Sequence, residues 1–188
     1  RRTPVLTRML STTGGIVREQ GLPVGEPDET GRIIPYQYRL EELVPPDGYA
    51  VSTQVLTWEF SPDNQGVSYD IGQEVVFQAA VQDQKTRIVI SKRAFSSLQE
   101  EGTEGIFVEG AHLALHEICG RDEDGTLIWK EEPLERWVTT QEEPEHVVEG
   151  LIAGRSYLLR EEQAPYGYCL MDPMVLTVSA DGRKLTEV

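Results

Sequence analysis

The sequence predicts an all-β protein made of two tandem β-sandwich domains, the first of them incomplete. Helical periodicity is almost absent from the 188 residues, and short runs of alternating or β-branched residues take its place. Gly, Pro and Asp turn signals separate these runs, as in a sandwich of many short strands. A twelve-residue motif also occurs twice, at a spacing of domain length.

The strand candidates are spread over the whole chain. They are, in order, residues 36–40, 53–60, 74–80, 87–91, 111–118, 156–160 and 174–179. Turn signals such as Asp47-Gly48, Asp124-Gly125 and Asp181-Gly182 lie between them. Only residues 95–101 lean towards a helix, and that segment is too short and too poorly capped to form one by itself.

The repeated motif divides the chain into domains. YRLEELVPPDGY at residues 38–49 recurs as YLLREEQAPYGY at residues 157–168, and the Tyr, Leu, Glu, Pro, Gly and Tyr positions coincide without gaps. The copies are 119 residues apart, which is a domain length and not a solenoid period. We expect a first domain over residues 1–84 that lacks its opening strands, and a second over residues 85–188 whose last strand is cut.

Each copy of the motif places a carboxylate next to a predicted core face. Strand alternation puts Tyr157, Leu159 and Glu161 on one face, and Leu159 must face the core. A buried carboxylate is costly unless it is paired or protonated, so an inward Glu161 would indicate a function. The alternative is a strand that ends at Glu161 and lets the side chain reach solvent. The same two interpretations apply to Glu42.

The motif Tyr-x-Leu-x-Glu-x-x-Ala-Pro-x-Gly-Tyr resembles the signature of Cna B-type, SpaA-like prealbumin domains of Gram-positive cell-surface proteins. The second half resembles that family over most of its length, through VISK (89–92), VEGAHL (108–113), WVTT (137–140) and PEHVVEGL (144–151). The first half is similar over residues 14–17, 21–25, 56–61 and 75–83, and residues 118–134 look like an insertion. The resemblance implies prealbumin-like (immunoglobulin-like) sandwiches in both halves.

Many members of this family form an intramolecular isopeptide bond, in which a first-strand lysine joins an Asn or Asp on the last strand and a buried Glu assists. By resemblance, Lys92 matches the lysine of the second domain and Glu161 its assisting acid. Glu42 matches the assisting acid of the first domain, and Asp83 stands where the family has its acceptor. An apolar core would favour a neutral amine, and strand pairing would hold the reacting groups together.

Each domain nevertheless carries only part of a triad. No lysine precedes Lys85, and the acceptor of the second domain would follow Val188. The cross-link candidates Lys92 and Asp83 lie in different predicted domains, so the partner of each is expected outside the chain. We expect no complete isopeptide bond within residues 1–188.

Composition excludes several other functions. The net charge is −15, with 32 acidic and 17 basic residues, which repels nucleic acid and anionic membranes. No run of 18 apolar residues could insert into a membrane. No motif predicts a metal site or a cofactor. His112 and His116 share one face of a strand and are expected in solvent, and His146 has no evident partner.

The two cysteines, Cys119 and Cys169, form no CxxC motif. A disulfide between them and two separate, partly buried thiols both stay open.

The resemblance implies a structural stalk or spacer in a surface adhesin or pilin-like protein, with no turnover of substrate. Its location would be extracellular and cell wall-attached, with neighbouring domains of the same polypeptide as partners. The alternative is a binding module whose loops recognise a host protein or a glycan.

Overall fold

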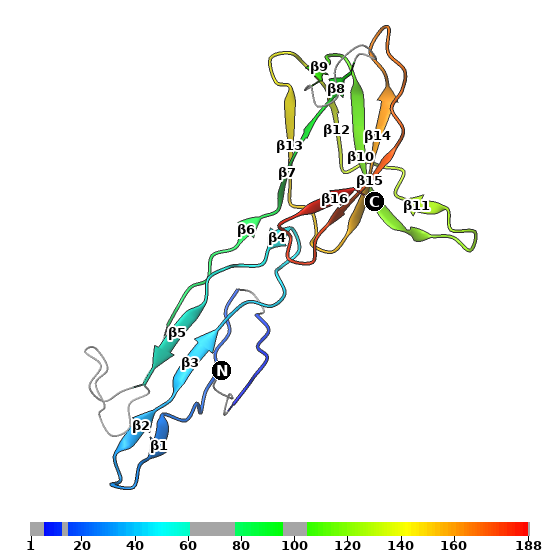
Figure 1. Ribbon diagram of the computed structural model, residues 1–188. Helices are drawn as coiled ribbons and strands as arrows, with labels where there is room; N and C mark the ends of the chain where they lie inside the picture. Colours follow the sequence, from blue (N-terminus) through cyan, green and yellow to red (C-terminus); the bar gives the residue numbers. More distant parts are fainter. Residues whose placement is uncertain (1–5, 13–14, 61–77, 96–104, 188) are drawn as a thin grey trace. The chain divides into compact units, whose positions relative to one another are not determined.

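The computed structural model describes residues 6–12, 15–60, 78–95 and 105–187, and every regular element among them is a β-strand (Figure 1). The predicted all-β class is therefore confirmed. The strand candidate at 74–80 and the segment 95–101 lie largely outside the described residues. Within the described parts, no helix is long or apolar enough to cross a membrane.

The chain divides into two compact units. The first holds residues 1–40 and 56–79, and the second holds residues 41–55 and 80–188. The loop at 41–55, which the sequence assigns to the first domain, thus belongs to the second unit. The division into two sandwich domains at 84/85 stays a prediction.

The first unit is built from two antiparallel strand pairs. These are β1 (Gly25–Pro27) with β2 (Ile33–Pro35), and β3 (Gln37–Leu40) with β5 (Leu56–Glu59). Tyr38 of β3 stacks on Trp58 of β5 with ring centroids 5.3 Å apart, and Phe60 packs edge-on against Tyr38 at 5.6 Å. An aromatic cluster therefore holds the β3–β5 pair together.

The second unit contains a six-stranded antiparallel sheet. Its strands are β10 (His112–Arg121), β11 (Leu127–Trp129), β12 (Glu135–Val138), β14 (Ser156–Gln163), β15 (Met174–Val178) and β16 (Leu185–Glu187). The strand order is β11-β10-β14-β15-β16, and β12 also pairs with β10. The long central strands β10 and β14 carry most of the buried side chains.

Shorter strand pairs complete the second unit. They are β7 (Arg87–Ser91) with β13 (Glu145–Glu149), β8 (Arg93–Ala94) with β9 (Ile106–Phe107), and β4 (Tyr49–Ala50) with β6 (Gln84–Lys85). The core lies between the β7–β13 pair and the large sheet. Its buried members are Leu113, Leu115, Val148, Leu151, Tyr157, Leu159, Leu176 and Val178, with Ile88 and Ile90 packed against them. This two-layer packing makes the unit a sandwich.

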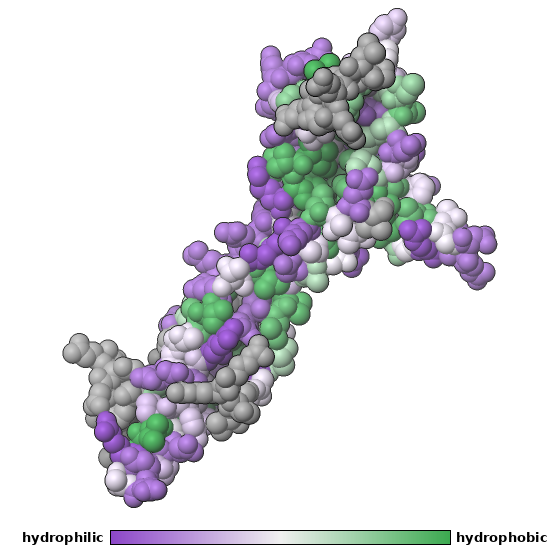
Figure 2. All heavy atoms as spheres, viewed as in Figure 1, coloured by the Kyte–Doolittle hydropathy of each residue, from purple (hydrophilic) through white to green (hydrophobic). Residues whose placement is uncertain are grey.

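The insertion at 118–134 covers part of the outer face of the large sheet. It forms a hairpin in which β11 pairs back onto β10, and the Nδ1 of His116 lies 2.9 Å from the carbonyl oxygen of Lys130. The Arg160 guanidinium of β14 lies 5.7 Å from the ring centroid of Trp129 on β11. The tip of the hairpin is hydrophilic and projects into solvent (Figure 2).

This hairpin corrects the expectation for one histidine. His112 is exposed as expected, whereas His116 is only 2% exposed. Strand alternation placed His116 on the outer face correctly, but that face is covered, and Ala114 and Leu158 are buried as well. Alternation identifies the face of a residue and not what packs on it.

Most sequence-predicted strands match observed ones. Residues 87–91 form β7 as predicted, and the candidates at 111–118 and 156–160 correspond to β10 and β14, which both run further than expected. Leu159 is buried in the sheet as predicted, at 4% exposure.

Replacing Leu115 tests this core. Leu115 is 0% exposed, so Leu115→Ala removes packed atoms and leaves a cavity, and should lower the free energy of unfolding by about 2–5 kcal/mol. Ile128→Ala, at a residue 47% exposed, is the matched control and should change it by about 0.5 kcal/mol or less. The urea midpoint of each variant measures its change in free energy, provided that the dependence of the unfolding free energy on urea concentration is unchanged. Equal losses for the two variants would contradict the proposed core.

Glu117 ties the hairpin to the rest of the sheet. Its carboxylate pairs with the ammonium of Lys130 and, at 2.6 Å, with Nη1 of Arg155. The hydrogen bond from Lys130, followed by the positive charges of Lys130 and Arg155, lowers the pKa of Glu117 below its ordinary value. A lowered pKa in the folded state means that the ionised carboxylate favours folding.

The stability that Glu117 contributes is present above the pKa of the unfolded state and is lost as the pH falls through the lower pKa of the folded state. Acidification below about pH 4.5 should therefore destabilise the protein, and Glu117→Gln should make stability less dependent on pH in that range. Urea midpoints from pH 7 to pH 3 give the measurement. An identical pH profile for the variant and the original chain would rule out this contribution.

Candidate functional site

Lys92 and Glu161 meet inside the second unit. Lys92 directly follows β7, and Glu161 lies on β14. Lys92 Nζ is 3.3 Å from Glu161 Oε2, and the side chains are 15% and 0% exposed. The two residues that the resemblance matches to the family's lysine and assisting acid therefore lie in contact. A fully buried carboxylate beside a nearly buried amine is costly unless the two are paired, as they are here.

The two oxygens of Glu161 have different surroundings. Oε2 accepts hydrogen bonds from Lys92 and, at 2.7 Å, from the backbone N–H of Met171. Oε1 is buried and has no hydrogen-bond partner among the described residues. An unpartnered buried oxygen can accept a further hydrogen bond, or donate one if the carboxyl group is protonated.

The position of Glu161 follows from the register of β14. The strand continues past Glu161 to Gln163, so the residue is not at a strand end with access to solvent. Alternation from Tyr157 and Leu159 turns its side chain to the core, and Leu113 is its cross-strand neighbour on β10. Of the two interpretations left open by the sequence, the inward one is correct for Glu161.

The first copy of the motif has the same local geometry. Glu42 Oε2 accepts a hydrogen bond of 2.6 Å from the N–H of Ser52, ten residues later, as Glu161 does from Met171. The N–H of Tyr49 donates to the carbonyl of Pro46 at 3.1 Å, and Tyr168 donates to Pro165 at the same distance. The repeat in the sequence is thus also a repeat in structure.

Gly48 and Gly167 are required by this shared turn. Their φ angles are +84° and +86°, in the left-handed region that favours glycine. The conformation of the loop is therefore encoded in each copy of the motif by itself.

The candidate acceptor Asp83 lies close to the Glu42 loop. The carbonyl of its neighbour Gln82 accepts a hydrogen bond of 3.3 Å from the hydroxyl of Ser52, whose N–H is bound by Glu42. Oδ1 of Asp83 is buried and has no hydrogen-bond partner in the described part of the chain. The strands β6 and β7 lie between Asp83 and Lys92 along the chain. Because an extended chain advances about 3.3 Å per residue, these strands hold the two residues apart. Whether any of these residues takes part in a cross-link stays a prediction.

Two further polar residues, His146 and Thr86, have partners that the sequence analysis did not predict. His146 has a partner after all: its ring stacks on Trp137 at 4.2 Å between centroids, and its Nε2 is 2.9 Å from Glu135 Oε1. Thr86, only 2% exposed, hydrogen-bonds through Oγ1 to the carbonyl of Leu151 at 2.6 Å. Trp137 lies on β12 and His146 on β13, within the WVTT and PEHVVEGL segments. The likeness of these two segments to the family motifs is the sequence feature that could have indicated the contact between His146 and Trp137.

No metal site and no disulfide emerges from the described residues. Among them, no three His, Cys, Asp or Glu side chains are grouped closely enough to hold a metal ion. Cys119 and Cys169 are both free and exposed, so of the two open alternatives the structure has separate thiols, outside the core.

Solved structures similar to the chain include crystal structures of the shaft pilin SpaA from Lactobacillus rhamnosus GG. The pilin is 16% identical, with 89% of this chain and 70% of the pilin covered and a TM-score of 0.36. Two mutants of that pilin give 15% and 16% identity, both cover 86% of this chain, and both have a TM-score of 0.36. This chain spans 65% of the length of the first mutant. No family model and no curated protein matches the chain.

Removing Glu161 tests the buried pair. Glu161→Ala leaves the Lys92 amine and the Met171 N–H without their acceptor, and should lower the free energy of unfolding by about 3–5 kcal/mol. Glu161→Gln keeps an acceptor for the N–H of Met171 and should lower the free energy of unfolding by less than Glu161→Ala does. Glu162→Ala is the control, because Glu162 pairs with Arg136 on the exposed side of the same strand and should matter little. A loss no larger for Glu161→Ala than for the control would show that the pair is not a structural element.

Proposed function

We propose that the chain is a structural stalk or spacer region of a bacterial cell-surface adhesin or pilin-like protein, extracellular and attached to the cell wall, which turns over no substrate. The observation that carries this proposal is the buried Lys92–Glu161 pair with the unpartnered Oε1 of Glu161. A paired amine and acid in a core, at the positions that match the family motif, support isopeptide chemistry. Such a bond would constrain unfolding, which a stalk under load requires.

In the proposed cross-link, Lys92 Nζ attacks as the neutral amine. It adds to the side-chain carbonyl carbon of an Asn, or a protonated Asp, on a strand outside residues 1–188. The new Nζ–C bond replaces the C–N bond of the carboxamide, or the C–O bond of the acid, and ammonia or water leaves. Glu161, as the protonated acid, donates a hydrogen bond to the acyl oxygen, and its carboxyl group relays a proton from Nζ to the leaving group.

The geometry of the pair supports these two roles. Oε2 of Glu161 already touches Nζ at 3.3 Å, which is the contact needed to accept its proton. Oε1 is buried and without a hydrogen-bond partner among the described residues, which leaves it available for the acyl group. The site would act once on its own chain, so it is not an enzyme in the sense of turnover.

A binding module for a host protein or a glycan is the second candidate. It is favoured by the loop between β14 and β15, where Tyr166 is fully exposed and Tyr168 and Leu170 are 47% and 58% exposed. Exposed aromatic side chains are common in recognition surfaces.

Intact mass tests the proposed cross-link. A chain continued beyond Val188 to include the next strand should weigh about 17 Da less than its residues predict for an Asn acceptor, or about 18 Da less for Asp. Lys92→Ala and Glu161→Ala should each restore the full mass, and peptide mapping should place the branch at Lys92. Residues 1–188 alone should have the full mass under reducing conditions. A folded longer chain of full mass would contradict the cross-link, and saturable glycan or host-protein binding that Tyr166→Ala abolishes would favour the binding module.

A further inference from the structure

The loop that ends the repeated motif has different surroundings in its two copies. Residues 48–51 of the first copy correspond to residues 167–170 of the second. In the first copy, Gly48 is buried and the next three residues are half-buried. In the second copy, all four residues are exposed. Because the turn itself is the same in both copies, the difference comes from what packs on it.

The first copy is held by backbone hydrogen bonds to one end of the sandwich in the second unit. The carbonyl of Gly48 accepts a hydrogen bond of 3.0 Å from the N–H of Thr86. Tyr49 and Ala50 form β4, which pairs with β6. The N–H of Val51 donates to the carbonyl of Asp181 at 2.9 Å, and Arg183 donates to the carbonyl of Val51. This end of the sandwich thus binds the loop mainly through backbone atoms.

The contact is close enough to require small residues. A Cβ added to Gly182 would lie 2.8 Å from the Cα of Ala50, and one added to Gly48 would lie 3.1 Å from the carbonyl oxygen of Gly150. A Cβ added to Gly167, which has the same φ as Gly48, would meet nothing within 4 Å. The turn of the second copy therefore lacks the partner that the first copy has.

We propose that residues 167–170 are a docking surface for the end of another sandwich domain of this kind, as the loop of the first copy is seated in the second unit. The partner would supply a backbone N–H to the carbonyl of Gly167, an edge strand for Tyr168 and Cys169, and a glycine opposite Cys169. Docking would also cover the exposed side chains of Tyr168 and Leu170. The proposal rests on the proposed stalk function, because it describes how successive domains join.

A second copy of the present chain is not the expected partner. The end of its own sandwich, formed by Thr86, Gly150 and Gly182, is already filled by its own Gly48 loop. The partner surface has to come from a further repeat whose end is free to receive the loop at 167–170.

The first test compares equivalent thiols within one molecule. Cys169 corresponds to Ala50, so the variant Ala50→Cys carries one thiol in the seated loop and one in the exposed loop. The thiol at position 50 should react with a maleimide about 10-fold more slowly than Cys169. Gly182→Ala should raise the rate at position 50 only. Gly125→Ala, at φ +83° with open space around it, is the matched control and should change neither rate. Equal rates at positions 50 and 169 would overturn the proposal.

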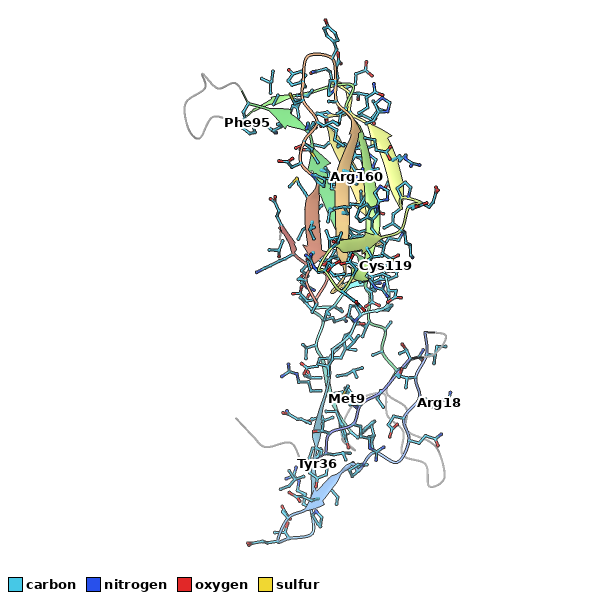
Figure 3. The ribbon with its side chains drawn as sticks, turned by 90° about the vertical axis from the view of Figure 1, so that its right-hand side faces the viewer. Met9, Arg18, Tyr36, Phe95, Cys119 and Arg160 are labelled. Atoms are coloured by element: carbon cyan, nitrogen blue, oxygen red, sulfur yellow. The ribbon has the colours of Figure 1, made fainter. Side chains whose placement is uncertain are left out.

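The second test supplies the missing partner. A second copy of residues 70–188 is added after Val188, so that equivalent positions stay 119 residues apart. In the added copy only, Cys119 and Cys169 are replaced by serine. The original Cys169 should then react about 10-fold more slowly than in the 188-residue chain. Cys119, exposed on β10 and far from the β14–β15 loop in Figure 3, should keep its rate and serves as the internal control.

Gly182→Ala in the added copy should restore the reactivity of the original Cys169. An unchanged Cys169 rate beside an added copy that unfolds cooperatively on heating would overturn the proposal. Thiol reactivity does not depend on any isopeptide bond, whereas intact mass does. A protected Cys169 in a chain of full mass would therefore separate a correct docking surface from an incorrect cross-link.

Discussion

The carboxylate of Glu161 is the constraint on which the second unit depends. A charge on the core face of β14 would be costly without partners, so two other parts of the chain have to reach it. The end of β7 brings Lys92 to within 3.3 Å, and the loop after β14 turns back so that the N–H of Met171 lies 2.7 Å away. One buried group thereby fixes the β7 layer, the large sheet and the β14–β15 loop relative to one another. The same group is the one that the proposed cross-link would use.

The repeated motif combines two structural roles. Its first half is a strand that carries the acid, and its second half is a rigid turn that projects from the end of the sheet. Because the turn is stabilised by its own Pro–Tyr hydrogen bond and its glycine, it keeps one shape with or without a partner. In the first copy the turn is seated against Thr86, Gly150 and Gly182, and most of the contacts are made by backbone atoms. Backbone contacts tolerate changes of side chain.

The hairpin at 118–134 changes the chemistry of the sheet that it covers. It shields His116 from solvent, places Trp129 beside Arg160, and is tied down by the ion pairs of Glu117 with Lys130 and Arg155. A sheet that would otherwise have one solvated face is thus partly buried on both, which explains why β10 has consecutive buried residues at positions 113–116. The acidic tip of the hairpin remains in solvent.

The sequence by itself determined the all-β class, most strand positions and the inward direction of Leu159, because strand alternation is a local pattern that survives in any tertiary context. The pairing of Lys92 with Glu161 was implied by the resemblance to SpaA-like domains, and alternation added only the inward direction of Glu161. Only the tertiary structure decided that His116 is buried and that residues 41–55 belong to the second unit. Both depend on which distant segment packs against a face or a turn, and a pattern of period two carries no information about that partner. The different burial of Gly48 and Gly167 has the same cause: two identical turns differ only in what lies beside them.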